Sequence, residues 1–145
     1  MSQLSTFHVG KYLFGVDVSL VQEVVRLQQM TPVPLAAPEI AGLINLRGEV
    51  LTAIDLRARL GLPPAEGGRE PVNVVVRVDD EPVSMLVDEI GGVLEVSQVP
   101  FEQTPSTVDE RVRDLLLGAY TLPDRLLLAL NASQVLDVGQ DSRAA

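Results

Sequence analysis

Residues 42–57 read GLINLRGEVLTAIDLR, two short apolar segments separated by an arginine and a glycine. Apolar runs of this length on both sides of a turn predict two half-buried β-strands joined by a tight bend. The bend directs the side chain of Arg47 to solvent. A guanidinium holds five N–H donors in a fixed geometry, so on a stiff turn it can bind a carboxylate or backbone carbonyls of another molecule with little loss of side-chain freedom. The segment therefore indicates binding rather than catalysis.

Three other stretches are expected to form β-hairpins: two alternate polar and apolar residues, and the third has an apolar run on each side of a turn. Gly10-Lys11 interrupts the first stretch, and a glycine at the first of two turn residues suits a type II′ turn. An acidic run at residues 79–81 interrupts the second stretch, and the tripeptide PDR interrupts the third. The hairpins are expected at residues 6–18, 72–87 and 115–130.

Short helices are expected at three places. Ser19 with Gln22 three residues later forms a capping-box pattern, which predicts a helix directly after the first hairpin. Asp55 is expected to cap a helical turn at residues 56–60, and Asn131 a last helix that ends at Leu136. In the first helix we expect Leu20, Val21, Val24 and Val25 to face the core, and Gln22, Glu23 and Arg26 to be exposed.

The composition indicates a mainly β protein. The chain has 145 residues, of which 46% are hydrophobic and only five are aromatic, so Val, Leu and Ile must form the core. We count about nine or ten short strands and three short helical pieces, which is too many strands for one small closed barrel. Two small barrels that share one core are therefore expected, with a polar loop at residues 65–71 as the best candidate for disorder.

Charge and cysteine content restrict the partners and the compartment. A net charge of −9 makes binding to nucleic acid or to an anionic membrane surface improbable, because both need clustered positive charge. The chain lacks cysteine, which excludes disulfides and thiolate metal sites and suits a reducing compartment. The sequence starts without a secretory signal, and its longest apolar run is too short to span a membrane. We therefore expect a soluble cytoplasmic protein whose partners are proteins.

Candidates for catalytic chemistry are few. His8 is the single histidine and alternates with Phe7 and Val9, so its side chain is expected to face solvent. Gly91-Gly92 lacks the lysine and the hydroxyl residue of a phosphate-binding loop, and we interpret it as a β-bulge or a close backbone approach. The sequence predicts no catalytic residue, no cofactor and no metal ion.

Two alternatives to a binding protein stay open at this point. One is a small acidic β-barrel hydrolase or metal-dependent enzyme, whose carboxylates should converge in one pocket rather than scatter along a turn and a strand end. The other is a small-ligand barrel, which requires an enclosed cavity. The carboxylates available to the enzyme alternative are Asp79, Asp80, Glu81 and Asp88.

The segment GLINLRGEVLTAIDLR resembles the signature of the CheW family, the bacterial chemotaxis coupling proteins. Nearly the whole chain takes part in this resemblance, because further family-like motifs follow in order. The resemblance implies two five-stranded SH3-like β-barrels with a few short helices, packed as one domain over residues 1–138. Residues 139–145 are interpreted from the sequence as a flexible tail. The other motifs are FGVDVSLVQEVV (14–25), MTPVPLAAPEIAGLINLRG (30–48), VSMLVDEIGGVLEV (83–96) and LLLGAYTLPDRLLLALNASQVL (115–136).

The resemblance also implies a function. CheW-like proteins are non-enzymatic adaptors that couple the cytoplasmic tip of methyl-accepting chemotaxis receptors to a CheA-type histidine kinase, whose regulatory domain shares the fold. The implied location is the cytoplasm, with recruitment to receptor arrays at the inner membrane and no membrane insertion. No cofactor is implied.

Seven residues are implied as partner-binding positions. Ser84 stands where the family commonly has glycine, and Ala53 replaces a frequent valine or proline. Val21, Glu23, Gly42 and Arg47 fall on family contact positions, and Ser84, Ile90 and Val93 fall near the groove where the receptor helix is expected to lie.

Overall fold

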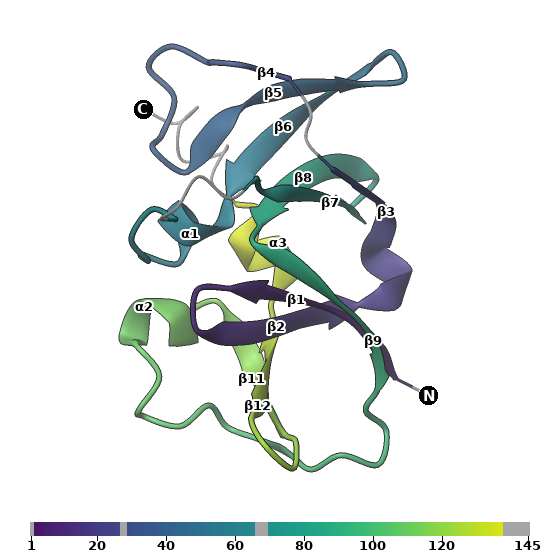
Figure 1. Cartoon of the computed structure of the whole chain (residues 1–145), viewed down its shortest axis with the longest axis vertical. Coiled ribbons are helices and arrows are strands. Elements are labelled where there is room, and N and C mark those ends of the chain that lie inside the picture. The colour runs from purple at the N-terminus through teal and green to yellow at the C-terminus, as the bar shows by residue number, and fades with distance from the viewer. Residues whose placement is uncertain (1, 27–28, 66–69, 138–145) are drawn as a thin grey trace.

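The computed structural model describes residues 2–26, 29–65 and 70–137, and consists of two six-stranded β-sheets stacked end to end (Figure 1). We call the first sheet with its helices the terminal subdomain and the second the inserted subdomain. The terminal subdomain contains β1 (Gln3–Val9), β2 (Tyr12–Asp17), β9 (Glu89–Glu95), β10 (Phe101–Glu102), β11 (Leu116–Thr121) and β12 (Leu126–Leu130). The inserted subdomain contains β3 (Val21–Val25), β4 (Met30–Thr31), β5 (Ile40–Leu46), β6 (Glu49–Asp55), β7 (Val72–Val78) and β8 (Glu81–Val87).

The two sheets are built on one plan. The strand order is β10-β11-β12-β2-β1-β9 in the terminal subdomain and β3-β7-β8-β6-β5-β4 in the inserted one. Each sheet thus joins two hairpins through one parallel pair, β12 with β2 and β6 with β8. The expected count of five strands per barrel differs from the observed six because β4 and β10, with two residues each, add one edge strand to each sheet.

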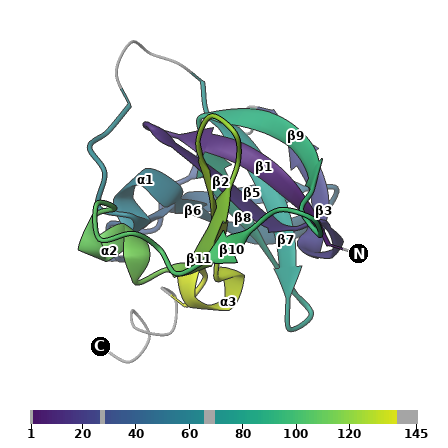
Figure 2. The same cartoon turned by 90° about the horizontal axis from the view of Figure 1, so that it is seen from below.

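The chain leaves the terminal subdomain after β2, completes the inserted subdomain, and returns at β9 (Figure 1). In the described part of the chain, four short helices accompany the strands. Seen from below, α1 and α2 lie beside one another at the junction (Figure 2), where Arg111 of α2 donates a hydrogen bond from Nη2 to the Ala58 carbonyl of α1. The helices are η1 (Val18–Leu20), α1 (Leu56–Arg59), α2 (Glu110–Arg113) and α3 (Ala132–Val135).

The hairpins expected from the sequence are confirmed, and their turns follow from positive backbone φ angles. Gly10 between β1 and β2 has φ 60°, as the first turn position of a type II′ turn requires. Between β5 and β6, Arg47 and Gly48 have φ 54° and 87°. Positive φ at both central residues matches the twist of the flanking strands, so this turn is tight and continues the sheet.

The prediction of a helix after the first hairpin is wrong. The structure has only the 3₁₀ turn η1 there, followed by strand β3, which pairs antiparallel with β7. Asp17 rather than Ser19 caps the turn, because its carboxylate accepts hydrogen bonds from the Ser19 backbone N–H at 2.9 Å and hydroxyl at 2.7 Å; these bonds lower the pKa of Asp17. The β-branched residues of the segment favour the extended pairing with β7 over a short isolated helix.

The two other expected helices are confirmed with their caps. Asp55 accepts from the Ala58 N–H at the start of α1, and Asn131 accepts from the Gln134 N–H at the start of α3. The loop at 65–71 lies partly, and the tail at 139–145 entirely, outside the described residues.

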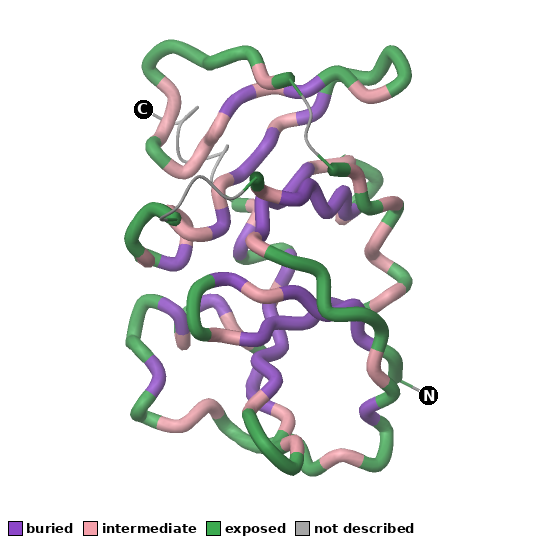
Figure 3. The backbone as a smooth tube through the Cα atoms, in the orientation of Figure 1, coloured by how far each residue is buried: buried purple, intermediate pink, exposed green. Residues whose placement is uncertain are grey.

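One hydrophobic core spans both subdomains, and Figure 3 shows the buried backbone running through the strands where the sheets meet. Phe7 and Phe14 of the terminal subdomain belong to the same buried cluster as Val74 and Met85 of the inserted one. On β7 both faces are buried, and Val74 and Val76 lie in the shared core. Val75 is also fully buried, in a second cluster with Ile44 of β5 and Leu51 of β6, whose side chains cover the other face of β7.

Val74→Ala should lower the free energy of unfolding by about 1 to 3 kcal/mol, because the Val74 side chain is 0% exposed and the substitution leaves a cavity in the shared core. Urea denaturation measures the change. Val24→Ala on β3 is the matched control, since that valine is 45% exposed and should lose little stability. A melt of Val74→Ala that coincides with wild type would contradict the core assignment.

Candidate partner-binding surface

Arg47 and Glu23, predicted separately as partner-binding residues, form an ion pair. Arg47 Nη1 donates a hydrogen bond to Glu23 Oε2 at 2.8 Å. Arg47 lies on the β5–β6 turn and Glu23 on β3, so the pair bridges two elements that are not adjacent in the sheet. The Arg47 side chain is 75% exposed and that of Glu23 is 19% exposed. The carboxylate thus anchors a guanidinium that stays largely in solvent.

The β5–β6 turn that carries Arg47 is itself fixed. Asn45 Oδ1 accepts a hydrogen bond from the Gly48 N–H at 3.0 Å, which closes the turn with a side chain. Arg47 adopts φ 54°, a conformation that an unbranched residue tolerates better than a β-branched one. The guanidinium is therefore presented from a rigid support.

Val21 lies next to Glu23, at the start of β3. The register of β3 against β7 shifts between Val21 and Glu23, so Gln22 is the extra residue of a bulge. Val21 is half-buried and packs against the shared core, and Gln22 accepts a hydrogen bond from Arg77 Nε. Val21 and Glu23 therefore lie together on the edge strand of the inserted subdomain, where they provide one apolar and one charged side chain.

Gly42 lies on β5, where strand β4 approaches closely. A Cβ atom on Gly42 would lie 2.7 Å from the carbonyl oxygen of Thr31, closer than such contacts occur. Gly42 is buried, so its contribution to a partner surface can only be indirect, through the position of β4.

Gly42→Ala should lower the free energy of unfolding by about 1 to 3 kcal/mol, because the added methyl group forces β4 away from β5 or strains the backbone. Differential scanning calorimetry measures the loss. Gly48→Ala tests the effect of a positive φ alone. A Cβ on Gly48 would meet no atom within 4 Å, but the φ of this residue is 87°. Equal stability of Gly42→Ala and wild type would show that β4 does not need this close approach.

Ile90 and Val93 form the second group of predicted positions, on strand β9 at the edge of the terminal subdomain. They are 40% and 53% exposed. The register of β9 against β1 shifts between Gly92, opposite Thr6, and Ile90, opposite Phe7, so Gly91 is the extra residue of a bulge. This confirms the interpretation of the Gly-Gly pair. In a regular strand, two residues three positions apart point to opposite faces. Because the bulge adds one residue between them, Ile90 and Val93 point to the same face.

Ser84 does not reach the surface. Its side chain is 0% exposed and donates a hydrogen bond from Oγ to Asn73 Oδ1 at 2.8 Å on the neighbouring strand β7. A buried hydroxyl whose hydrogen bond is satisfied within the sheet has nothing to offer a partner. The candidate surface therefore consists of Val21, Glu23 and Arg47 on the inserted subdomain, and Ile90 and Val93 on the terminal subdomain.

The chain is similar to proteins of a known family. The CheW-like domain family matches residues 3–140. The chain belongs to the CheW family. It is 32% identical to the chemotaxis protein CheW of Rhizobium meliloti (strain 1021), over 92% of this chain and 86% of that protein. It is 33% identical to the chemotaxis protein CheW of Bacillus subtilis (strain 168), over 93% of this chain and 86% of that protein. The crystal structure of the scaffolding protein TtCheW from Thermoanaerobacter tengcongensis superposes with a TM-score of 0.80 at 24% identity, covering 90% of this chain and 88% of that one.

CheW membership settles the class of function. The chain is a chemotaxis scaffolding and coupling protein, and its fold of two SH3-like subdomains is confirmed by the superposition. CheW proteins are scaffolds without enzymatic activity, so the predicted absence of catalysis is confirmed. Among the described residues, no helix has both the length and the apolar character needed to cross a membrane.

The four carboxylates on which the enzyme alternative depends do not converge in one pocket. Asp79 and Asp80 occupy the β7–β8 turn and Glu81 begins β8, whereas Asp88 follows the far end of β8. Within residues 2–26, 29–65 and 70–137, no group of three His, Cys, Asp or Glu side chains could hold a metal ion. Asp79 and Glu81 line an open groove of about 1040 Å³, which Asp88 does not reach. The carboxylates scatter, and the groove is not the enclosed cavity that a small-ligand barrel needs.

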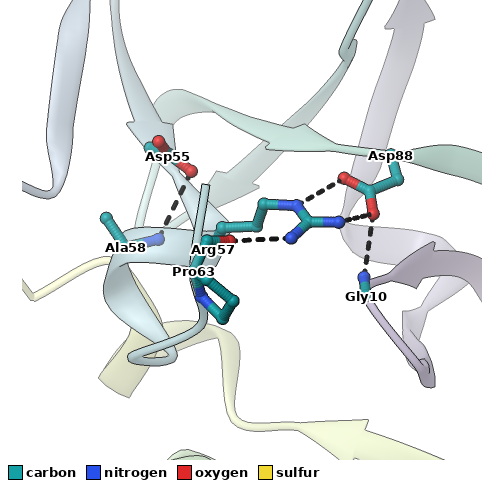
Figure 4. A network of polar contacts seen from close by, with 6 residues as sticks. All are labelled: Gly10, Asp55, Arg57, Ala58, Pro63 and Asp88. Carbon is teal, nitrogen blue, oxygen red and sulfur yellow. Dashed lines mark hydrogen bonds and ion pairs between the residues drawn. The ribbon is translucent and has the colours of Figure 1, made fainter. Parts of the chain in front are cut away.

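A polar network at the junction of the subdomains (Figure 4) is not predicted by any pattern in the sequence. Arg57 of α1 donates from Nε and Nη2 to the two carboxylate oxygens of Asp88, at 3.0 and 2.6 Å. Asp88 Oδ2 also accepts from the Gly10 N–H at 2.8 Å. Hydrogen bonding to Asp88 raises the pKa of Arg57. The only signal in the sequence was that Arg57 ends the CheW-like signature and Asp88 follows a buried strand.

Proposed function

We propose that this CheW-family protein couples methyl-accepting chemotaxis receptors to a CheA-type histidine kinase, and that it does so through the Arg47–Glu23 pair together with Val21, Ile90 and Val93. The observation that supports this most directly is the exposed Arg47 side chain anchored on Glu23. We propose a cytoplasmic location, with recruitment to receptor arrays at the inner membrane, and a single domain over residues 1–138.

The charged pair is suited to binding a second protein. Glu23 accepts from one nitrogen of the guanidinium, Nη1, so most of the five N–H donors of Arg47 are available to a partner. The ion pair and the closed turn hold these donors in place before binding, which lowers the entropy lost on association. A carboxylate or a row of backbone carbonyls on the partner would match this geometry.

Ile90 and Val93 would supply the apolar part of the contact. Two half-exposed aliphatic side chains on an edge strand can pack against the apolar face of a receptor helix, while the charged pair sets its register. We assign the receptor contact to both subdomains together and the kinase contact to a domain of the same fold. This division of contacts is part of the proposal.

Co-sedimentation tests the proposal. The protein is mixed with receptor-bearing membranes and the kinase from the same cell, and the pellet is analysed for all three components. We expect the kinase to sediment only when this protein is present. Kinase that sediments equally without the protein, or protein that stays in the supernatant, would show that it does not couple the two.

A further inference from the structure

Asp88 is fixed to the terminal subdomain although it directly follows the last strand of the inserted one. Its backbone N–H donates to the His8 carbonyl at 3.0 Å, and its carboxylate accepts from the Gly10 N–H at 2.8 Å. Both partners belong to the β1–β2 hairpin. The residue at which the chain passes from one subdomain to the other is thus held by the hairpin through main chain and side chain.

Arg57 connects α1 of the inserted subdomain to this fixed residue. All three guanidinium nitrogens are used, Nε and Nη2 for Asp88 and Nη1 for the Pro63 carbonyl at 2.7 Å (Figure 4). The side chains of Arg57 and Asp88 are 19% and 14% exposed. A two-point ion pair with so little water around it is directional and stiff, unlike a surface ion pair.

Two further arginines join α1 to the terminal subdomain by hydrogen bonds. Arg59 donates from Nε to the Val135 carbonyl at 3.0 Å and from Nη2 to the Gln134 carbonyl at 2.8 Å, both in α3. With the contact from Arg111, α1 is tied to β1–β2, α2 and α3. The shared apolar core also joins the subdomains, but the hydrophobic effect that drives its burial is non-directional, whereas the two-point ion pair has a defined geometry.

We infer that Arg57 and Asp88 are positioning residues that set the orientation of the inserted subdomain against the terminal one, and thereby the spacing between the Arg47–Glu23 pair and the Ile90–Val93 pair. Neither residue touches the partner. The part of this inference that concerns binding rests on the proposed function. A rigid partner that contacts both pairs at once binds well only when their spacing is fixed in advance.

The absence of cysteine from the chain allows a direct measurement of the orientation. Glu81→Cys in the inserted subdomain and Thr121→Cys in the terminal one provide two exposed sites for nitroxide spin labels. Double electron–electron resonance then gives the distribution of distances between the subdomains. We expect one narrow distribution in the labelled wild-type chain and a broader, shifted one after Arg57→Ala.

Three further variants separate positioning from a general loss of stability. Val74→Ala weakens the core without touching the network, and should keep the narrow distribution. Arg57→Lys retains the charge but not the two-point geometry, and Asp88→Asn retains the shape but not the charge; both should fold and give intermediate breadth. If Arg57→Ala does not fold, these two variants decide. A wild-type distribution in every folded variant of Arg57 and Asp88 would overturn the inference.

Binding is measured on the same samples by co-sedimentation with receptor-bearing membranes. We expect Arg57→Ala to weaken binding about tenfold, with partial recovery in Arg57→Lys. Broadened distances with unchanged binding would overturn the link between orientation and docking. If the wild-type chain itself does not sediment, the proposed function fails, whereas the distance measurement still decides whether Arg57 and Asp88 set the orientation.

Discussion

Arg47→Glu should abolish assembly with receptor and kinase while the protein melts close to the wild-type temperature. The substitution removes the N–H donors offered to the partner and places a second carboxylate where Glu23 now accepts a hydrogen bond at 2.8 Å. Truncating one anchor of an interface costs binding roughly 1 to 3 kcal/mol, and reversed charge adds repulsion against the partner's matching group. We expect a loss of more than about a hundredfold in the dissociation constant.

Folding should respond differently because the Arg47 side chain is 75% exposed. Ion pairs of this kind contribute about 0.2 to 1 kcal/mol to stability. Arginine and glutamate are both unbranched at Cβ, so the positive φ of the turn disfavours them to a similar extent. Arg47→Ala and Glu23→Ala should each show the binding defect in weaker form.

The matched control is Arg125→Glu. Arg125 also lies on a hairpin turn, between β11 and β12, with a side chain that is 49% exposed and 3.8 Å from an acidic neighbour, Asp124. Reversing the charge of Arg125 should leave assembly with receptor and kinase intact. The measurement is co-sedimentation beside a thermal melt of each variant. Normal assembly of Arg47→Glu would remove Arg47 from the surface, and a collapsed melt would give it a structural role instead.

Phe14→Ala should produce the largest loss of stability, about 3 to 5 kcal/mol. Phe14 is 0% exposed and lies on β2, between β1 and β12, with its ring 6.3 Å from that of Phe7 and 5.7 Å from that of Tyr12. The ring packs against two of the five aromatic residues of the chain, so its removal opens a cavity beside them. Domains are commonly stable by only about 5 to 15 kcal/mol, so much of the margin disappears.

Urea denaturation followed by circular dichroism measures this loss. Leu117→Ala on β11 is the control, because that leucine is 64% exposed and its truncation should change stability by no more than about 0.5 kcal/mol. A loss below about 1 kcal/mol for Phe14→Ala would mean that the core repacks around the missing ring.

Local pattern was sufficient for the hairpins but not for β3. Alternation around a turn residue identifies a hairpin because both strands and their connection lie within one short window. Val21 and Glu23 were assigned to a helix because the capping-box pattern at Ser19 is also local. Their actual partner, β7, lies some fifty residues further on, as the register of Val21 with Val76 shows. A partner strand so far away in the sequence cannot be recognised from the pattern of residues within β3 itself.

The same limit explains which parts of the candidate surface were predictable. The resemblance to CheW proteins supplied Arg47 and Glu23 individually, but the hydrogen bond between them joins residues 24 positions apart. The resemblance also placed Ser84 near the groove of the receptor helix, but position in a motif does not report burial. The parallel pairing of β8 with β6 makes it an interior strand and buries Ser84. Tertiary neighbours, not local spacing, decide these cases.

The insertion of one subdomain into the other sets an order of folding. The inserted subdomain is contiguous in sequence, and most of its strand pairs close short loops. The β1–β2 hairpin must instead wait for β9 and β12, because Leu4 pairs with Leu94 and Phe14 with Leu128. Since closing a long loop costs more chain entropy than closing a short one, the inserted subdomain should form first and bring the two ends of the terminal sheet together. During synthesis, the apolar β1–β2 hairpin would therefore leave the ribosome about a hundred residues before β12, and its β2 edge would stay unpaired until then.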